Sequence, residues 1–177
     1  TFIEGTTLNE NLKKLKTNKL LTDDNSYNSI NKLKISLGIQ EKILEGLFFP
    51  DTYYFYDGTP GIDILKKSHK LMMKKLNDAW KNKTPNLPYK NKYEALIVAS
   101  IIEKELGNRD EASLIAGVFV NRLRINMPLQ SDPTVIYGLQ DQFEGNLTKQ
   151  DIMRDTIYNT YTRNGLPPSP ICLPGFD

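Results

Sequence analysis

Hydrophobic and polar positions repeat with helical spacing along most of this 177-residue chain. Capping and stop signals bound several of these stretches. Gly38 follows one of them, and Asp132-Pro133 opens another, where Asp132 is predicted to be the N-cap. Only residues 52–56 are rich in β-prone aromatic side chains. The spacing predicts helices within residues 4–15, 26–38, 62–80, 92–106, 109–124, 132–137 and 147–155.

These elements form two predicted regions and together indicate an α+β fold. Residues 1–45 are predicted to form a small N-terminal module, and residues 46–177 a mainly helical domain with short β-strands. The tail after residue 158 is rich in proline and glycine, which excludes regular helix there. The predicted core face of helix 109–124 consists of Leu114, Ile115, Val118 and Phe119.

One apolar run is long and ends on a carboxylate. Residues 95–102 contain a single polar residue, Ser100, and Glu103 follows directly. Such a run belongs in a protein interior, whereas a charged residue is almost never fully buried without a partner. Either Glu103 only ends the helix, exposed or paired, or it is placed there for chemistry.

The helical register separates Glu103 from the next acid. Glu103 shares a face with Ala99 and Ser100, whose small side chains are predicted to leave space above its carboxylate. Glu105 lies roughly 200° around the helix, so the two carboxylates are not expected to share a role. Apolar surroundings raise the pKa of a carboxyl group, and one that stays protonated near neutral pH suits a general acid.

Composition narrows the chemistry further. The 23 basic and 21 acidic residues leave a net charge of +2, which does not indicate nucleic-acid binding. A single cysteine, Cys172, excludes an internal disulfide, and with one histidine, His69, neither a zinc site nor a nucleophilic triad has much support. No run of 18 apolar residues predicts a transmembrane helix, and no signal peptide is visible. No cofactor and no metal are therefore predicted.

Two segments combine neutral hydrogen-bonding side chains with aromatic rings, residues 130–139 and 158–161. An aromatic ring has an apolar face that can stack on a sugar, while its polar group and neighbouring amides can bond sugar hydroxyls. The two segments therefore indicate a groove that binds a neutral or mildly charged glycan.

Four segments resemble the endolytic murein transglycosylases of the MltG (YceG-like) type, in the family's order. They are EGLFFPDTYYF (45–55), ASIIEKE (99–105), VFVNRLRINMPLQSDPTVIYGL (118–139) and YNTYTRNGLPPSPICLPG (158–175). The resemblance covers residues 40–177, and residues 2–15 more loosely resemble the start of a small LysM-like module. The chain departs from the family pattern at Leu106, Ser169, Cys172 and Leu173, and lacks the usual proline before Glu4.

The resemblance implies site residues. Glu103, the first glutamate of Glu-Lys-Glu, would be the catalytic acid. Asp132 has an alternative role, as only the N-cap that its place before proline predicts. The residues implied to line or shape the glycan groove are Asn121, Gln130, Ser131, Asp132, Tyr137, Tyr158, Asn159, Thr160 and Tyr161.

The implied reaction is non-hydrolytic cleavage of the β-1,4 bond between N-acetylmuramic acid and N-acetylglucosamine, which leaves 1,6-anhydro ends and would terminate or trim nascent strands. The implied partners are peptidoglycan glycan strands, with peptidoglycan synthases as candidates, and no nucleic acid. The family also implies a single-pass anchor in the cell inner membrane, upstream of this chain, with the catalytic region facing the periplasm or cell wall. Two alternatives stay open: a muramidase-type hydrolase that uses Glu103 and Asp132, and a non-catalytic peptidoglycan-binding module.

Overall fold

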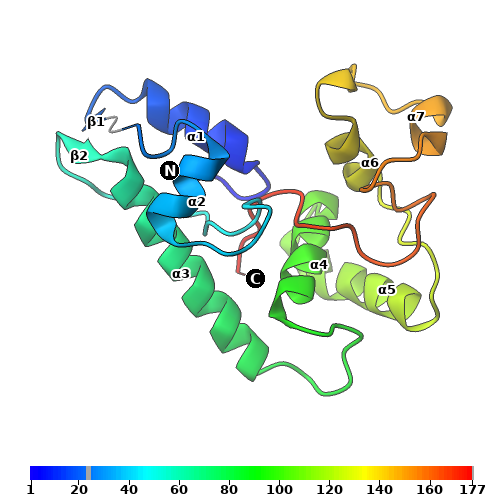
Figure 1. Ribbon diagram of the computed structural model, residues 1–177. Coiled ribbons are helices and arrows are strands. Elements are labelled where there is room, and N and C mark those ends of the chain that lie inside the picture. The colour runs from blue at the N-terminus through cyan, green and yellow to red at the C-terminus, as the bar shows by residue number, and fades with distance from the viewer. Residues whose placement is uncertain (23–24, 177) are drawn as a thin grey trace. The chain divides into compact units, whose positions relative to one another are not determined.

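Helices supply most of the regular structure in the computed structural model, which describes residues 1–22 and 25–176 (Figure 1). Two short strands, β1 (Leu21–Thr22) and β2 (Thr59–Pro60), pair in parallel, with Leu21 opposite Thr59. Each predicted helical stretch overlaps a helix, although some of the helices extend one or two residues beyond it. The helices are α1 (Leu8–Thr17), α2 (Ile30–Leu37), α3 (Gly61–Lys81), α4 (Lys92–Glu105), α5 (Ala112–Arg124), α6 (Asp132–Leu139) and α7 (Lys149–Met153), with the 3₁₀ turns η1 (Arg109–Glu111) and η2 (Gln140–Gln142).

The chain divides into two units, and the first comprises residues 1–81 with 172–176. Local sequence explains the helix ends in this unit. Thr7 and Glu10 form a capping box at the start of α1, each side chain accepting the other residue's backbone N–H. Gly38 ends α2 with a φ of 66°, in the left-handed region that glycine adopts readily.

The first unit holds the predicted N-terminal module and α3 together. No separate LysM-like module stands out among residues 1–22 and 25–45. The buried carboxylate of Glu45 accepts the backbone N–H of Leu8 at 2.8 Å, so the segment before α3 binds the start of α1. The domain boundary at residue 45 remains a prediction, and that residue lies within the first unit.

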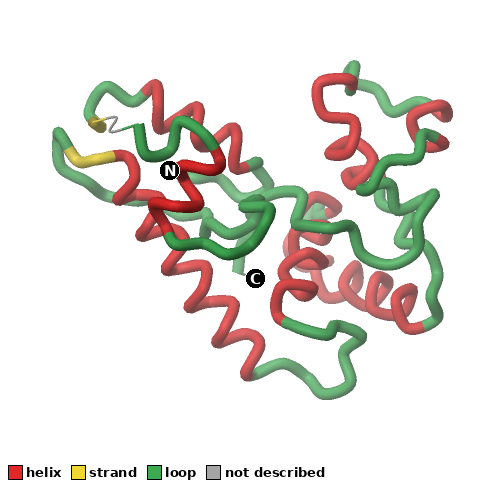
Figure 2. The backbone as a smooth tube through the Cα atoms, viewed as in Figure 1, coloured by secondary structure: helices red, strands yellow, loops and turns green. Residues whose placement is uncertain are grey.

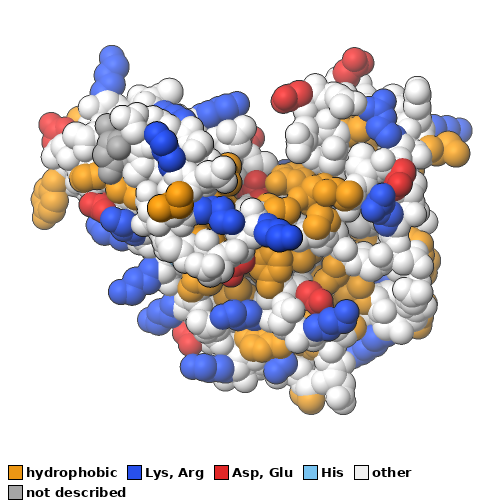
Figure 3. All heavy atoms as spheres, viewed as in Figure 1, with side chains coloured by type: hydrophobic (Ala, Val, Ile, Leu, Met, Phe, Trp, Pro, Cys, Tyr) orange, Lys and Arg blue, Asp and Glu red, His pale blue; other side chains and the backbone are white. Residues whose placement is uncertain are grey.

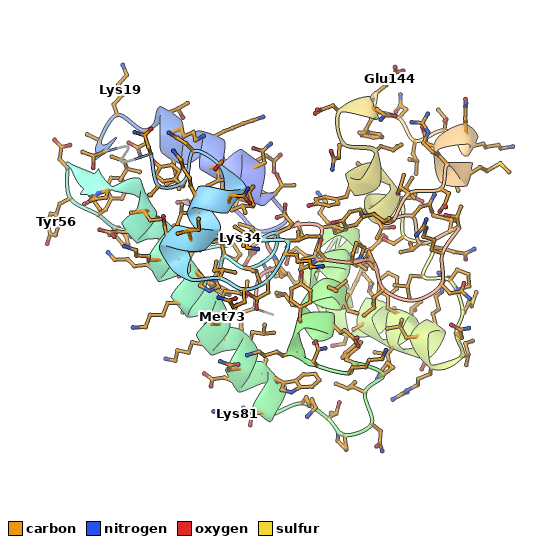
Figure 4. The ribbon with its side chains drawn as sticks, in the orientation of Figure 1. Lys19, Lys34, Tyr56, Met73, Lys81 and Glu144 are labelled. Atoms are coloured by element: carbon orange, nitrogen blue, oxygen red, sulfur yellow. The ribbon has the colours of Figure 1, made fainter. Side chains whose placement is uncertain are left out.

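The β-prone stretch 52–56 is not a strand, and that prediction is wrong. Tyr54 and Tyr56 are 86% and 90% exposed, and Figure 4 shows Tyr56 at the outer edge of its unit. β-propensity describes how a side chain fits a pleated, half-buried surface, and it forms no strand without a neighbouring strand. Within the described part of the chain, no strand pairs with this stretch.

The outer face of α3 carries exposed lysines, and Figure 3 shows basic side chains along the edge where α3 runs in Figure 1. Lys66 pairs with Asp63 at 3.3 Å one turn away, and both side chains are about half exposed. An exposed pair of this kind contributes about 0–1 kcal/mol. The stability of α3 therefore rests on its apolar face, where Ile62, Ile64, Leu65 and Met72 are buried.

The second unit comprises residues 82–171 and has α4 in its core. The predicted burial of the apolar run is confirmed, because Leu96, Ile97, Val98 and Ile101 are at most 3% exposed. Residues 154–171 contain no helix and run as a long loop, drawn in green in Figure 2. The core cluster consists of Ile97, Val98, Ile101, Phe119, Leu129, Tyr158 and Ile171.

The predicted core face of α5 is only partly right. Phe119 is buried and Ile115 packs against the core, but Leu114 is 73% and Val118 44% exposed. The third core contact of α5 is Leu123, so the buried stripe follows a spacing of four residues. The prediction assigned the helix a wider buried face than its packing against α4 provides.

Candidate active site

Helix α4 begins at a well-formed cap and ends at the surface. Asn91 Oδ1 accepts the N–H of Glu94 at 3.0 Å, and the Glu94 carboxylate accepts the N–H of Lys90 at 2.7 Å. After the buried run, Glu103 is half-buried and Glu105 is exposed. The helix therefore places Glu103 where its carboxyl group is partly enclosed by protein yet still reaches solvent.

The surroundings of Glu103 combine apolar and small residues. Ile102, the preceding residue, packs against the core, and Ala99, one turn back on the Glu103 face, is half-buried. A general acid must reach the oxygen that it protonates, so a fully buried carboxyl group could not act. The half-buried position of Glu103 meets this requirement, and its catalytic role remains a prediction.

Ser100 does not leave open space above Glu103, and in this respect the prediction is wrong. Its hydroxyl group donates to Ile97 O at 2.7 Å and accepts the N–H of Ile171 at 3.0 Å. Ser100 is fully buried. Its small side chain instead makes room for the C-terminal tail, which is bonded directly to α4.

Glu105 has more than a surface role, contrary to the expectation drawn from the helix alone. Its Oε1 accepts a hydrogen bond from Ser131 Oγ at 2.6 Å, and Ser131 is only 1% exposed. Ser131 is one of the predicted groove residues. The second glutamate therefore contacts a residue of the predicted site.

Asp132 is not the N-cap of α6, and that alternative is wrong. The cap position is Ser131, whose side chain makes no capping bond, and Asp132 is the first residue of the helix, followed by Pro133. The Asp132 carboxylate instead accepts a hydrogen bond from Tyr161 Oη at 2.6 Å. Asp132 and Tyr161 thus form a pair that joins two segments of the predicted groove.

The pKa of Tyr161 is shifted by charged neighbours. The hydrogen bond to Asp132, assisted by partial burial and by the negative charges of Asp132 and Glu105, raises the pKa of Tyr161 to about 12. The positive charge of Arg122 acts in the opposite direction. The phenol therefore keeps its proton, and its donation to Asp132, to a higher pH than an ordinary tyrosine would.

Buried hydroxyl groups connect the loop before α6 with the loop at 158–161. Thr160 Oγ1 accepts the N–H of Ser131 at 3.0 Å and bonds Thr134 Oγ1 at 2.8 Å. Thr160 O accepts the N–H of Gln130 at 3.0 Å. Thr160 and Ser131 are at most 2% exposed, so in this structure they shape the site and present little surface to a ligand.

Asn159 is fully buried and all its amide atoms bond the backbone. Its Nδ2 donates to Ile152 O at 2.9 Å and to Arg154 O at 2.7 Å, and its Oδ1 accepts the N–H groups of Tyr161 and Thr162. Asn159 therefore presents no surface to a ligand in this structure. It shapes the loop that carries Tyr161.

Two tyrosines of the predicted site lie against each other. The rings of Tyr137 and Tyr158 meet edge to face, with their centroids 4.8 Å apart. Tyr158 is buried and its hydroxyl group bonds Ser169 Oγ at 2.7 Å, whereas Tyr137 is half-buried. Of this pair, Tyr137 has the more accessible ring.

The remaining predicted residues, Asn121 and Gln130, are exposed. Asn121 makes one long contact with Arg124, at 3.5 Å. Gln130 has a φ of 53°, which is uncommon for a residue other than glycine and recurs at functional loops. Arg122 was not predicted, although it lies within the segment 118–139; its guanidinium group donates to Leu129 O, next to Gln130.

The whole chain matches one family of sequences, the YceG-like family, over residues 1–177. The chain belongs to the YceG-like family. It is 38% identical over 135 residues to an endolytic murein transglycosylase from Bacillus subtilis, an alignment that covers 75% of this chain and 36% of the relative. It is 36% identical over 140 residues to an endolytic murein transglycosylase from Streptococcus pneumoniae, covering 76% of this chain and 25% of the relative.

A solved structure supports the same assignment. The crystal structure of a yceG-like protein from Listeria monocytogenes is 30% identical to this YceG-like chain, with a TM-score of 0.70, and the match covers 98% of this chain and 62% of that one. The chain thus spans about a third of the length of the Bacillus subtilis relative and about a quarter of the length of the Streptococcus pneumoniae relative. In residues 1–22 and 25–176, none of the helices has the length and apolar character needed to cross a bilayer.

Proposed function

We propose that this YceG-like chain cleaves peptidoglycan glycan strands, as an endolytic lytic transglycosylase with Glu103 as its catalytic acid. The observation that carries the proposal is the half-buried position of Glu103 on a helix whose end is bonded to one of the predicted groove segments, at Ser131. The names of its relatives support the substrate class. An anchor upstream of this chain, in the cell inner membrane, and contacts with peptidoglycan synthases belong to the same proposal.

The proposed reaction needs one carboxyl group. Glu103, protonated, donates its proton to the glycosidic oxygen while the bond from that oxygen to muramyl C1 breaks. The 6-hydroxyl group of the same muramyl residue closes on C1, and its proton passes to the Glu103 carboxylate. The products are a 1,6-anhydro-muramyl end and a free 4-hydroxyl group, and Glu103 is protonated again. Because the nucleophile belongs to the substrate, the second carboxylate that ordinary glycosidases use is not needed.

Exposed and half-buried groups of the two predicted groove segments would bind the strand. Tyr161 and Tyr137 offer partly exposed rings for sugar faces, while Gln130 and Asp132 offer polar groups for sugar hydroxyls. The bond from Tyr161 Oη to Asp132 leaves the second carboxylate oxygen of Asp132 available to a ligand. Binding along these groups would hold the scissile bond next to Glu103.

A hydrolase is the second candidate, and the exposed Asp132 carboxylate favours it. Asp132 lies on a segment bonded to the helix of Glu103, so it could activate a water molecule in a two-carboxylate mechanism. The product would then be a reducing muramyl end in place of an anhydro end. A third reading, a binding module without catalysis, predicts retention of glycan and no cleavage.

The test is Glu103→Gln on purified peptidoglycan, with the product ends identified by mass spectrometry. Glutamine has nearly the shape of glutamate but can neither deliver a proton to the leaving oxygen nor accept one. General acid–base catalysis typically raises the reaction rate about 10²–10⁴-fold. Because Glu103 would act in both steps, the expected loss of rate in Glu103→Gln lies at the upper end of this range or beyond. Wild-type chain should produce anhydro ends, which differ from reducing ends by one water molecule.

Glu105→Gln is the matched control on the same helix. The amide oxygen of glutamine still accepts the Ser131 hydroxyl proton, so most activity should remain. Circular dichroism checks that both variants fold. Reducing ends from the wild-type chain would establish the hydrolase instead. A folded Glu103→Gln variant that forms anhydro ends at close to the wild-type rate would eliminate Glu103 as the acid.

A further inference from the structure

The end of α4 carries a hydrogen bond that joins an exposed carboxylate to a buried hydroxyl group. Ser131 is 1% exposed, and its hydroxyl proton goes to Glu105 Oε1 at 2.6 Å. A hydrogen bond to a charged acceptor is stronger than one between neutral groups. Since the serine is shielded from water, loss of Glu105 would leave its hydroxyl group without this acceptor.

Ser131 also joins two loops. Its N–H donates to Thr160 Oγ1 at 3.0 Å, and its carbonyl oxygen accepts the Thr134 hydroxyl proton at 2.7 Å. The neighbouring Gln130 N–H donates to Thr160 O at 3.0 Å. A single contact from Glu105 therefore connects α4 with both the segment before α6 and the segment at 158–161.

We infer that Glu105 is a positioning residue, which through Ser131 aligns the two glycan-binding loops with the helix that carries Glu103. This inference rests on the proposed function. Glu103 lies two residues before Glu105, so a displacement of the loops at Ser131 changes the distance between the bound strand and the acid. Small errors of placement are costly in catalysis, since reacting groups must meet in a narrow range of geometry.

The charge of Glu105 has a second, weaker effect in the same place. Glu105 is among the groups that hold the pKa of Tyr161 well above its usual range, after the hydrogen bond from Tyr161 to Asp132. The negative charge of Glu105 therefore acts on the Tyr161–Asp132 pair, which joins the two loops. Glutamine at 105 would remove the charge and keep the acceptor, so the two contributions can be measured separately.

Four variants test the inference: Glu105→Ala, Glu105→Gln, Ser131→Ala and the double variant Glu105→Ala/Ser131→Ala. Soluble glycan strands serve as substrate, and kcat and KM are measured per folded molecule. Glu105→Ala should lower kcat about 10- to 100-fold with a smaller rise in KM, because the loops still bind glycan but hold it away from Glu103. Glu105→Gln should restore kcat to within a few-fold of wild type. The double variant should be no worse than Glu105→Ala alone, since both changes break one contact.

Glu144→Ala is the matched control, because Glu144 is an exposed glutamate of the same unit on the loop between α6 and α7 (Figure 4). It should leave kcat and KM unchanged. A residue that only stabilised the fold would lower the melting temperature and leave kcat and KM per folded molecule as in wild type, which would overturn the inference. Additive losses in the double variant would also overturn it. A wild-type chain that cleaves no glycan would instead overturn the proposed function.

Discussion

Replacing Asn159 with alanine should destabilise the second unit strongly, because the residue is fully buried and bonds four backbone groups. Alanine would leave two carbonyl oxygens and two N–H groups of the 152–162 segment without these partners. A net hydrogen bond contributes about 1 kcal/mol and an abandoned buried partner costs about 1–3 kcal/mol, so a loss of roughly 2–4 kcal/mol is expected. That is a large share of the stability of an ordinary domain, about 5–15 kcal/mol.

Two measurements check this magnitude. Urea unfolding followed by circular dichroism gives the change in the free energy of unfolding, with Asn146→Ala, an exposed asparagine of the same unit, as the control. Hydrogen exchange then locates the effect: the amide protons of Tyr161 and Thr162, which bond Asn159 Oδ1, should exchange faster than in the control. Equal urea midpoints for the two variants would refute the reasoning.

Asn159→Asp separates the donor half of this network from the acceptor half. The carboxylate keeps the bonds from Tyr161 and Thr162, but faces the carbonyl oxygens of Ile152 and Arg154 without a proton to donate. The pKa of this introduced carboxyl should be raised in the folded state by that environment. Stability should therefore be highest below the unfolded pKa of about 3.9 and fall as pH rises from that value through the higher folded pKa. A pH-independent loss would contradict the assigned contacts.

Two further predictions concern helix packing and the tyrosine–aspartate pair. Gly61→Ala should destabilise the first unit, because the new Cβ would lie 2.3 Å from Tyr27 Oη. Gly117→Ala, on α5, has open space around the new Cβ and should stabilise the second unit by roughly 0.5–1 kcal/mol. Thermal unfolding compares the two variants, and a stabilised Gly61→Ala would contradict the packing. Asp132→Asn should lower the pKa of Tyr161 from about 12 toward its ordinary value of 10, read by tyrosinate absorbance against a chain that also carries Tyr161→Phe. Because the pKa of Tyr161 is higher in the folded state, the contribution of Tyr161 to stability is present below pH 10 and lost as pH rises toward 12. An unchanged titration in Asp132→Asn would show that the bond to Asp132 has no effect on this pKa.

Periodicity within the sequence determined the helices and the burial of the central run. Residues 95–102 are apolar on all sides of a helix except at Ser100, so this stretch was predicted to be buried. Glu103 follows it directly and therefore lies where the helix leaves the protein interior. Capping chemistry is also local, which is why Gly38 marks a helix end in the structure as it does in the sequence. These features depend on residues within about one or two helical turns of each other.

Only the tertiary structure decided the partners of the polar side chains. The helix alone placed Glu105 away from Glu103 but could not show that it meets Ser131, 26 residues later. Asp132 has the sequence of an N-cap, yet its carboxylate bonds Tyr161, 29 residues away. Ser100 looked like a gap above the acid and holds Ile171 instead. A side chain's local register fixes the direction in which it leaves a helix, whereas its partner depends on where the loops fold back, and that depends on the packing of the whole unit.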